Sequence, residues 1–326
     1  MNEQIKIKKE GSVRIIEFYN PPYNYITLNM LRELYTQLLK DRDDDSIRVM
    51  VLSGGLEDTF LTHYDVDDLI DFHNAIAKKR SPATNRMIAY ILCWLFDKMD
   101  RWPWLERIAL KNTKKRSNGE QSIFYWTRCL QILENFPKPI IAAINGLALG
   151  GGCEISLCCD FRYMANGDNY RIGLPEVLLG ITPGGTGTPL RLPRIIGEGR
   201  AMEMLMTGGI YPPSKAEAMG LINQVLPPDE FMPVVMKLAK KLSRGAPIAQ
   251  ACIRKSVRKG SRMAWSKGQV LEMAGALTAM NSEDAGRGME AYVTHVASQF
   301  KGVEPEKRFE LYDDLNTGHL TDFKGE

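Results

Sequence analysis

Short apolar runs alternate with segments whose apolar residues recur every three or four positions along most of this chain. The short runs predict strands, and the one at 139–146 (PIIAAING) is so continuously apolar that both faces of its strand are expected to be covered. The periodic segments predict helices, the first of which carries leucines at 28, 31, 34, 38 and 39. Further strands are expected at 12–18, 48–54, 161–165 and 221–226 and around Ile172. This alternation favours an α/β fold over an all-α or all-β one.

From Pro228 onward the pattern becomes helical, first through 231–244 and 247–259 and then through a long stretch at 264–300. The chain is therefore expected to divide into a core at 1–227, a helical C-terminal region at 228–301 and a charged, weakly patterned tail at 302–326. The tail is either an arm that docks on a partner or a frayed chain end. Chain ends of this kind favour the second alternative.

Composition narrows the class of protein. Apolar residues make up 44% and charged residues 25% of the 326 positions, as in a soluble globular chain with a sizeable core. A formal net charge of +3 gives no reason to expect nucleic acid as a partner. Six cysteines without a CxxC pair, and four histidines without metal-ligand spacing, predict reduced, mostly buried thiols and no metal site. A charged N-terminus and the lack of an apolar run of roughly 20 residues argue against a membrane and make the cytoplasm the expected compartment.

The most distinctive motif is ALGGGCE at 148–154, in which three glycines end a buried strand and lead into a helix. Without Cβ atoms, Gly150, Gly151 and Gly152 let a ligand approach the backbone closely. The free N–H groups at the start of a helix stabilise developing negative charge, so this turn supplies half of an oxyanion hole. Taken alone, the same glycines are also explained by a tight turn between a strand and a helix.

Two other segments carry candidate chemistry. In GLPEVLLGITPGGTGTPLRLPR at 173–194, Glu176 follows Pro175 and precedes a glycine-rich stretch that includes Gly184. This stretch is not a phosphate-binding loop, because no Lys-Ser or Lys-Thr follows its glycines, and it lacks GxGxxG spacing. The second segment, FLTHYDVDD at 60–68, follows a strand as an active-site loop would, although alone it is equally an acidic surface turn.

Together these segments, in this order, resemble the crotonase (enoyl-CoA hydratase/isomerase) superfamily. The similarity runs from about Val13 to Lys301 and is strongest in KPIIAAINGLALGGGCEISLCCDFRY and LPEVLLGITPGGTG. SKAEAMGLINQVLPPDEF, from 214, is similar to the family segment that follows the core. The resemblance implies a spiral of ββα turns, a helical C-terminal trimerisation region and a homotrimer or dimer of trimers. It also implies an acyl-CoA thioester substrate and no cofactor, since coenzyme A is part of the substrate.

The resemblance also assigns roles to residues. It places oxyanion-hole amides at Gly151 and at Tyr64, and it places the two carboxylates of the hydratases at Glu154 and Glu176. Neighbouring residues are then expected to line the substrate site: Thr62, His63, Asp65, Gly150, Gly152, Pro175 and Gly184.

Hydration of a 2-enoyl-CoA thioester needs a base for water, an acid for Cα and an electrophile for the enolate. Two glutamates and two amides supply all three, but the sequence leaves open which glutamate is the base and which the acid. Alternatives within the same fold are double-bond isomerisation and thioester hydrolysis. A non-catalytic acyl-CoA-binding or assembly subunit is an alternative of another class, and the presence of Glu154 and Glu176 argues against it.

Three departures from the family pattern change these expectations. Tyr64 stands where relatives have a small residue, so its ring either reshapes the acyl pocket or packs elsewhere; a role for His63 or Tyr64 as an extra acid is the less favoured interpretation. Asp67 and Asp68 occupy the region where many relatives have a CoA-binding lysine.

The segment at about 70–135 is enlarged, with an apolar, Trp-rich stretch at 87–110 before a basic run. It is expected to form a helical pair on the core or on another subunit rather than a lid. Membrane-surface and RNA-binding roles for it are weaker alternatives.

Overall fold

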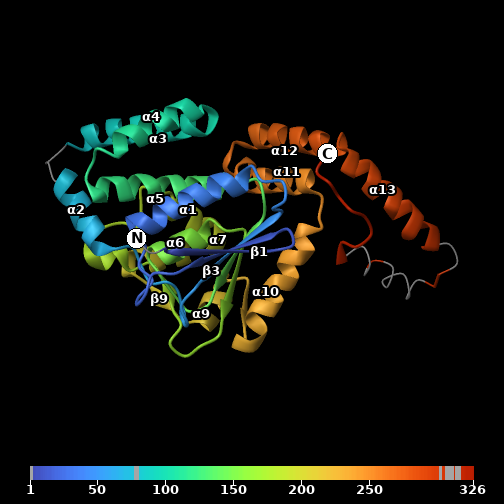
Figure 1. Ribbon diagram of the computed structural model, residues 1–326, viewed down its shortest axis with the longest axis horizontal. Coiled ribbons are helices and arrows are strands. Elements are labelled where there is room, and N and C mark those ends of the chain that lie inside the picture. The colour runs from blue at the N-terminus through green and yellow to red at the C-terminus, as the bar shows by residue number, and fades with distance from the viewer. Residues whose placement is uncertain (1–2, 77–80, 301–302, 305–311, 313–316) are drawn as a thin grey trace.

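Two β-sheets form the centre of the computed structural model, which describes residues 3–76, 81–300, 303–304, 312 and 317–326. The larger sheet has the order β1-β2-β3-β5-β7-β10 and the smaller one β4-β6-β8-β9. Figure 1 labels strands β1, β3 and β9. The larger sheet consists of β1 (Ile5–Glu10), β2 (Val13–Phe18), β3 (Val49–Gly54), β5 (Ile140–Ile144), β7 (Phe161–Ala165) and β10 (Gln224–Leu226). The smaller sheet consists of β4 (Thr59–Leu61), β6 (Leu147–Leu149), β8 (Ile172–Gly173) and β9 (Ile210–Tyr211).

Successive turns of the chain place one strand in each sheet. The pairs β3 and β4, β5 and β6, and β7 and β8 each begin in the larger sheet and end in the smaller one. Within each sheet these strands are parallel neighbours, and only β1 and β9 pair antiparallel. This arrangement is a spiral of repeated turns, as expected, and the α/β class is confirmed.

Both faces of β5 in the larger sheet are covered, as the apolar run at 139–146 predicted. Ile140, Ala142 and Ile144 join the core cluster that includes α1 (Leu28–Arg42) and α5 (Asn118–Asn135). Ile141 and Ala143 point to the opposite face and join the cluster formed with α10 (Pro228–Ser243). Since alternate side chains of a strand point to opposite faces, continuous apolar sequence is required here.

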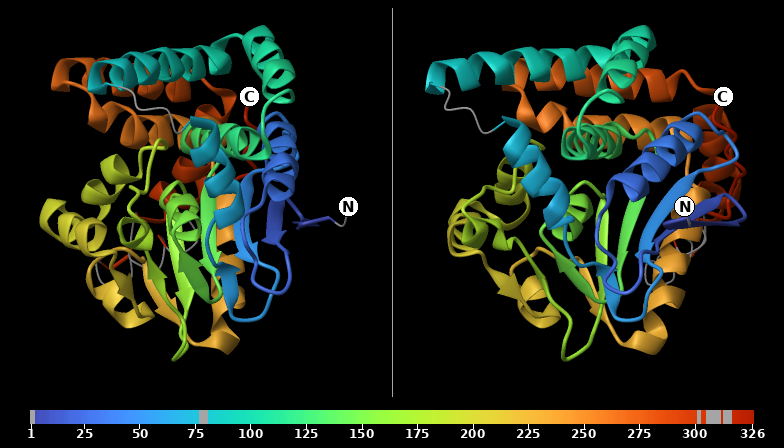
Figure 2. Two further views of the ribbon diagram at one scale, coloured as in Figure 1. Left: turned by 90° about the vertical axis from the view of Figure 1, so that its left-hand side faces the viewer. Right: turned by 60° about the vertical axis from the view of Figure 1, so that its left-hand side comes forward.

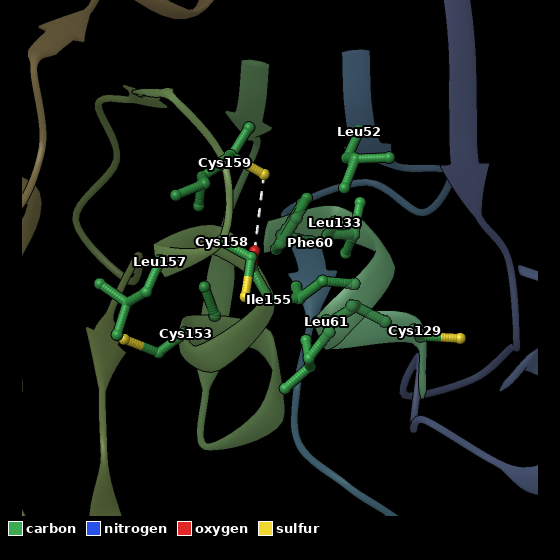
Figure 3. Close-up of a cluster of buried hydrophobic side chains, with 14 of the residues drawn as sticks. Leu52, Phe60, Leu61, Cys129, Leu133, Cys153, Ile155, Leu157, Cys158 and Cys159 are labelled. Atoms are coloured by element: carbon green, nitrogen blue, oxygen red, sulfur yellow. Dashed lines mark hydrogen bonds between the residues drawn. The ribbon is translucent and has the colours of Figure 1, made fainter. Parts of the chain in front are cut away.

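Buried thiols and aliphatic side chains fill the space between α5, α6 (Gly151–Leu157) and the two sheets (Figure 3). Cys129, Cys153, Cys158 and Cys159 are buried, and all six cysteines are free. The expectation of reduced, mostly buried thiols is therefore confirmed, with Cys93 as the exposed exception. Burial raises the pKa of the Cys153 thiol well above its ordinary value, so this neighbour of Glu154 is a packing residue and not a nucleophile.

The segment at about 70–135 consists of one deeply buried helix and a more exposed pair of helices. It contains most of α2 (Val66–Ile76), then α3 (Pro82–Arg101), α4 (Pro103–Thr113) and α5. Helix α5 is deeply buried against α1 and α2, whereas α3 exposes Tyr90 and Trp94. Figures 1 and 2 show the α3–α4 hairpin above α5, on the side away from the larger sheet. The expected helical pair on the core is therefore present.

One arginine joins this hairpin to the core. The side chain of Arg128 on α5 is fully buried, and its Nη2 lies 3.0 Å from Asp100 at the end of α3 and 2.7 Å from Glu106 on α4. The ring of Phe96 on α3 also lies against Phe124 on α5. A buried guanidinium with two carboxylate partners is costly to disrupt, because removing it leaves the acids without their cation.

The remaining helices lie after the three sheet turns. They are η1 (Pro175–Leu179), α7 (Thr188–Ile196), α8 (Glu198–Thr207), α9 (Pro213–Ala218), α11 (Pro247–Arg258), η2 (Gly260–Arg262), α12 (Trp265–Met280), α13 (Glu283–His295) and η3 (Ala297–Phe300). The helical pattern expected at 264–300 is confirmed, and it divides into separate helices because Ser282 accepts from the Ala285 N–H and begins α13. None of the helices in the described ranges is long and apolar enough to cross a bilayer.

The expectation of a frayed tail is wrong for residues 317–326. Asp284 at the start of α13 accepts hydrogen bonds from the backbone N–H groups of Lys324 and Gly325. The Arg48 guanidinium donates to the carbonyl oxygens of Phe323 and Lys324. Polar pairing thus fixes a segment that carries no apolar pattern. The expectation for 302, 305–311 and 313–316 lies outside the described residues.

Replacing Arg128 with Met is expected to lower the free energy of unfolding by about 3 kcal/mol, because it leaves Glu106 buried without its partner. Urea denaturation measures the change. The matched control is Arg116→Met, whose ion pair with Glu120 is exposed and is expected to contribute less than about 1 kcal/mol. Equal losses in the two variants would contradict the anchoring role of Arg128.

Candidate active site

The three motifs meet because they follow three neighbouring parallel strands. Thr62 follows β4, Gly150 follows β6 and Leu174 follows β8. Residues Leu61 and Ala148 are paired across β4 and β6, and Leu149 and Gly173 are paired across β6 and β8. Carboxyl ends of parallel strands lie on one edge of a sheet, where ligands commonly bind in α/β folds. The loops that leave this edge therefore converge, although they are far apart in the sequence.

Gly150 lies at the point of closest approach. Its φ angle of 51° is in the left-handed region, and its N–H donates to the Gly173 carbonyl oxygen. A Cβ atom at this position would lie 3.1 Å from Glu176 Oε1 and 3.8 Å from the Cβ atom of His63. Glycine is required here by both conformation and space. Gly150 thus brings the loop after β4 and the loop after β8 to the same place.

Two backbone amides point toward this region. Gly151 is the first residue of α6, so its N–H has no acceptor within the helix. Ile26 donates to the His63 carbonyl oxygen and accepts from the Asp65 N–H, so the Tyr64 N–H between them points the other way. That direction is the side of β6 and α6, because the Thr62 carbonyl, two positions earlier, accepts from the Leu149 N–H. The assignment of these two amides as the donors of an oxyanion hole stays a prediction.

Glu154 is buried and its carboxylate is hydrogen-bonded. Its side chain projects from the first turn of α6, and Oε1 accepts from Thr188 Oγ1 at 2.6 Å and from Thr186 Oγ1 at 3.2 Å. Burial raises the pKa of Glu154, while the hydroxyls of Thr188 and Thr186 and the positive charge of Arg191 act in the opposite direction. The surroundings thus supply donors to the ionised form.

Glu176 has the contrasting environment. Its Oε2 atom is buried without a hydrogen-bond partner among the described residues. Burial, followed by the negative charge of Glu154, raises the pKa of Glu176 to about 7. One carboxyl group is therefore supplied with donors and the other is not, which is the arrangement that separates a base from an acid.

Thr186, Thr188 and Arg191 were not predicted from the sequence. The threonines lie within the glycine-rich stretch already identified, but no spacing rule distinguishes them from other turn residues. Arg191 is 6% exposed, and its Nε donates to Glu134 at 2.7 Å. Thr188 and Arg191 are three positions apart on α7, so they share the helix face that carries the Glu154 contact.

The other predicted substrate residues have mainly structural contacts. The Thr62 hydroxyl donates to the Tyr23 carbonyl oxygen, and Asp65 Oδ1 accepts from the Asp67 N–H at the start of α2. His63 Nδ1–H donates to the Tyr64 carbonyl oxygen at 2.7 Å, and its ring stacks on Tyr25. Of the two alternatives left open for Tyr64, the structure shows packing, since this residue is 8% exposed.

Gly152 and Gly184 differ from Gly150. A Cβ at Gly152 would collide with the Leu61 carbonyl oxygen, so this glycine allows α6 to pack on β4. Gly184 is exposed, and the atoms nearest to a Cβ there belong to Thr182. Pro175 is the first residue of η1 and directs the chain into the turn that carries Glu176.

A cavity of about 560 Å³ lies elsewhere, at the C-terminal end of α6. It is lined by residues of α7 and α11 and by Leu157, whereas the predicted site lies at the N-terminal end of α6. The convergence of hydrogen-bond donors and carboxylates, and not the size of the cavity, therefore identifies the candidate site. The described residues contain no group of three or more His, Cys, Asp or Glu side chains that could hold a metal ion.

Replacing Glu176 with Gln is expected to stabilise the protein more at pH 8 than at pH 4. Below the pKa of Glu176 in the unfolded state, the carboxyl group is protonated in both the folded and the unfolded protein. Above its pKa of about 7 in the folded state, the buried negative charge lowers the free energy of unfolding, and Gln removes this charge. Allowing for partial solvent access, the difference between the two pH values is expected to be about 1–2 kcal/mol. Urea denaturation at both pH values measures it.

The matched control is Glu230→Gln, an exposed position on α10. Because this carboxyl group is exposed, the difference between the two pH values is expected to be smaller than for Glu176→Gln. A pH-independent effect of Glu176→Gln would show that Glu176 ionises without cost.

Comparison with known proteins agrees with this geometry. A sequence model described as enoyl-CoA hydratase/isomerase matches residues 109–303. Crotonyl-CoA hydratase of Syntrophomonas wolfei is 26% identical over 299 residues, which cover 91% of this chain and 98% of that protein. 2,3-Dehydroadipyl-CoA hydratase of Escherichia coli is 36% identical over 177 residues, covering 54% of this chain and 67% of that protein.

A solved structure gives the same result. The crystal structure of enoyl-CoA hydratase from Bacillus anthracis has a TM-score of 0.70 and 26% identity, and covers 90% of this chain and 96% of that chain. The family match includes Gly151, Glu154 and Glu176 and begins after Tyr64. Because it spans more than half of the chain and the fold agrees with it, the protein belongs to the enoyl-CoA hydratase/isomerase family.

Proposed function

We propose that this protein adds water across the double bond of a 2-enoyl-CoA thioester. The observation that carries the proposal is the contrast between two carboxyl groups at one sheet edge. Glu154 accepts two hydroxyl hydrogen bonds, and Glu176 has a pKa raised to about 7 and a buried oxygen without a partner among the described residues. The names of two similar relatives, a crotonyl-CoA hydratase and a short-chain-enoyl-CoA hydratase, support the same reaction.

This contrast supports one assignment of the two roles that the sequence left open. Glu154, whose ionised form accepts hydrogen bonds from Thr186 and Thr188, acts as the base that removes a proton from water. Glu176, whose pKa is raised to about 7, donates a proton to Cα. The hydroxide adds to Cβ while Cα gains this proton, so the substrate gains one water and the two glutamates exchange protonation states.

The amides of Gly151 and Tyr64 would act on the thioester carbonyl. As water adds at Cβ, negative charge moves to the carbonyl oxygen, and two N–H donors stabilise that enolate. Acid, base and electrophile all come from the chain, and hydration changes no net oxidation state. We therefore propose no metal and no redox cofactor for the reaction, with coenzyme A entering only as part of the substrate.

The acidic residues in the first turn of α2 affect where the phosphates of coenzyme A are expected to bind. Asp68 Oδ2 accepts from Ser122 Oγ at 2.8 Å, so this carboxylate is already engaged by α5. Asp67 is exposed and carries a negative charge where a phosphate-binding cation would be useful. The cations that hold the coenzyme A phosphates are therefore expected outside this stretch of α2.

We further propose that the chain assembles as a homotrimer or a dimer of trimers. Val270, Met273 and Leu277 form an apolar stripe on α12 that is at least half exposed in the single chain. A contiguous exposed apolar stripe of this kind is typical of a subunit interface. It belongs to the helical C-terminal region for which trimerisation was expected.

Changing Glu154 or Glu176 to Gln is expected to lower kcat for hydration by at least about 100-fold, because each change removes a proton-transfer group. Mass spectrometry of a mixed enoyl-CoA panel measures the gain of one water, and Glu230→Gln serves as the matched control. The rate of the unaltered enzyme should fall as pH rises through about 7, where Glu176 loses its proton.

Release of free coenzyme A from the panel would replace the proposal with a hydrolase. Conversion of an enoyl ester to a positional isomer of equal mass, detected by chromatography, would replace it with an isomerase. Near-normal hydration by either Gln variant would remove the assignment of roles. Binding of the esters without any turnover would favour the non-catalytic subunit.

Replacing Leu277 with Glu is expected to shift the assembly toward monomer, because the apolar stripe then carries a charge. Sedimentation velocity measures the mass, expected at three or six times the 36.8 kDa of one chain for the unaltered protein. The control is Met206→Glu, a similarly exposed apolar position on α8. A monomeric unaltered protein would contradict the assembly.

A further inference from the structure

The side chain of Tyr64 points away from the candidate site and into the core. Its ring packs edge-on against Trp126 of α5, with ring centroids 5.7 Å apart and an angle of 74° between the planes. Its hydroxyl donates to Ser122 Oγ at 2.5 Å. The bulky residue therefore does not narrow the pocket, and the donor amide and the buried ring lie on opposite sides of one backbone position.

The hydroxyl of Tyr64 begins a short chain of hydrogen bonds. Ser122, which is fully buried, accepts from Tyr64 and donates in turn to Asp68 Oδ2 at 2.8 Å. Tyr64 lies just before α2, Asp68 lies in its first turn and Ser122 lies on α5. These hydrogen bonds therefore attach both Tyr64 and Asp68, four positions apart in the sequence, to the deeply buried helix α5. A buried hydroxyl without a partner would be costly, so each bond in the series constrains the next.

Trp126 extends the same support to the second amide. Ser122 and Trp126 are four positions apart on α5, so they share one face of that helix. A Cβ atom at Gly151 would lie 3.5 Å from Trp126 Cη2 and 2.7 Å from Ile26 Cδ1. The same Trp126 ring that meets Tyr64 therefore also lies against Gly151.

The backbone of Ile26 completes the arrangement. Its N–H and carbonyl bind the residues on either side of Tyr64, while its side chain lies against Gly151. Both amides are thus located by contacts to shared groups and not by independent loops. Transition-state stabilisation by such donors depends on their position to within a fraction of an ångström.

We infer that Ser122 and Trp126 of α5, together with the Tyr64 hydroxyl, are positioning residues that set the distance between the Tyr64 and Gly151 amides. The inference rests on the proposed function, because it concerns the oxyanion hole of that reaction. The hydrogen bond to Ser122 explains why a tyrosine stands at position 64. A small residue at this position could not reach α5, whereas Tyr64 can be anchored there by its hydroxyl.

The test uses the full chain and three variants: Tyr64→Phe, Ser122→Ala and Tyr125→Phe. The first two break the hydrogen-bond chain at different atoms and leave the Tyr64 amide in place. Tyr125→Phe is the matched control, because it also removes a buried phenolic hydroxyl from α5 but its ring lies against Tyr35 and Phe124. Ser122→Thr keeps the hydroxyl and is expected to restore the behaviour that Ser122→Ala loses.

The probe is cinnamoyl-CoA, whose absorption band moves to longer wavelength when its carbonyl is polarised. In Tyr64→Phe and Ser122→Ala the shift of the cinnamoyl-CoA absorption band on binding is expected to be smaller. For an enoyl-CoA that the unaltered protein hydrates, kcat is expected to fall about tenfold while KM changes less than about threefold. Tyr125→Phe and Ser122→Thr are expected to match the unaltered enzyme. Thermal unfolding verifies that each variant is folded.

Folded Tyr64→Phe and Ser122→Ala variants with the full spectral shift and the full kcat would overturn the inference and leave the proposed function intact. An equal loss in Tyr125→Phe would also overturn it, since the effect would then be general loosening of α5. An unaltered protein that neither shifts the probe spectrum nor hydrates any ester would overturn the proposed function, and this inference with it.

Discussion

Parallel pairing of three very short strands positions the chemistry of this protein. Strands β4, β6 and β8 are each only two or three residues long, yet their register places the ends of three distant segments side by side. Strands this short are not stable alone. They are held because each follows a longer, largely buried strand of the larger sheet, so the geometry of the site depends on the packing of β3, β5 and β7.

The fold and the principal residues could be predicted because they leave local signals. The run at 139–146 and the three glycines after it have a pattern that fits a buried strand followed by a close-packed turn. Glu154 and Glu176 could be identified because the resemblance to known hydratases includes their flanking residues. Strand β1 was missed, although Ile5 and Ile7 alternate with lysines, because a strand with charged neighbours is also compatible with a solvated chain end.

What could not be predicted depends on contacts between distant residues. Nothing near Glu154 in the sequence indicates that Thr186 and Thr188 donate to it, and nothing near Tyr64 indicates Ser122 as its partner. The docking of 317–326 on Asp284 is of the same kind, since it is made by backbone N–H groups that nearly every residue carries. Local pattern identifies elements, whereas these contacts arise only when the elements pack.

One feature of the site links its two carboxyl groups mechanically. Glu176 and the two threonines that donate to Glu154 belong to the same short stretch of chain, from η1 to the start of α7. A displacement of this stretch changes the solvation of Glu176 and the hydrogen bonds of Glu154 in a single movement. The proton affinities of the two carboxyl groups are therefore not independent properties. A ligand or partner that displaces this stretch changes the proton affinities of both carboxyl groups together. The shape of a bound substrate can therefore affect both groups through one segment.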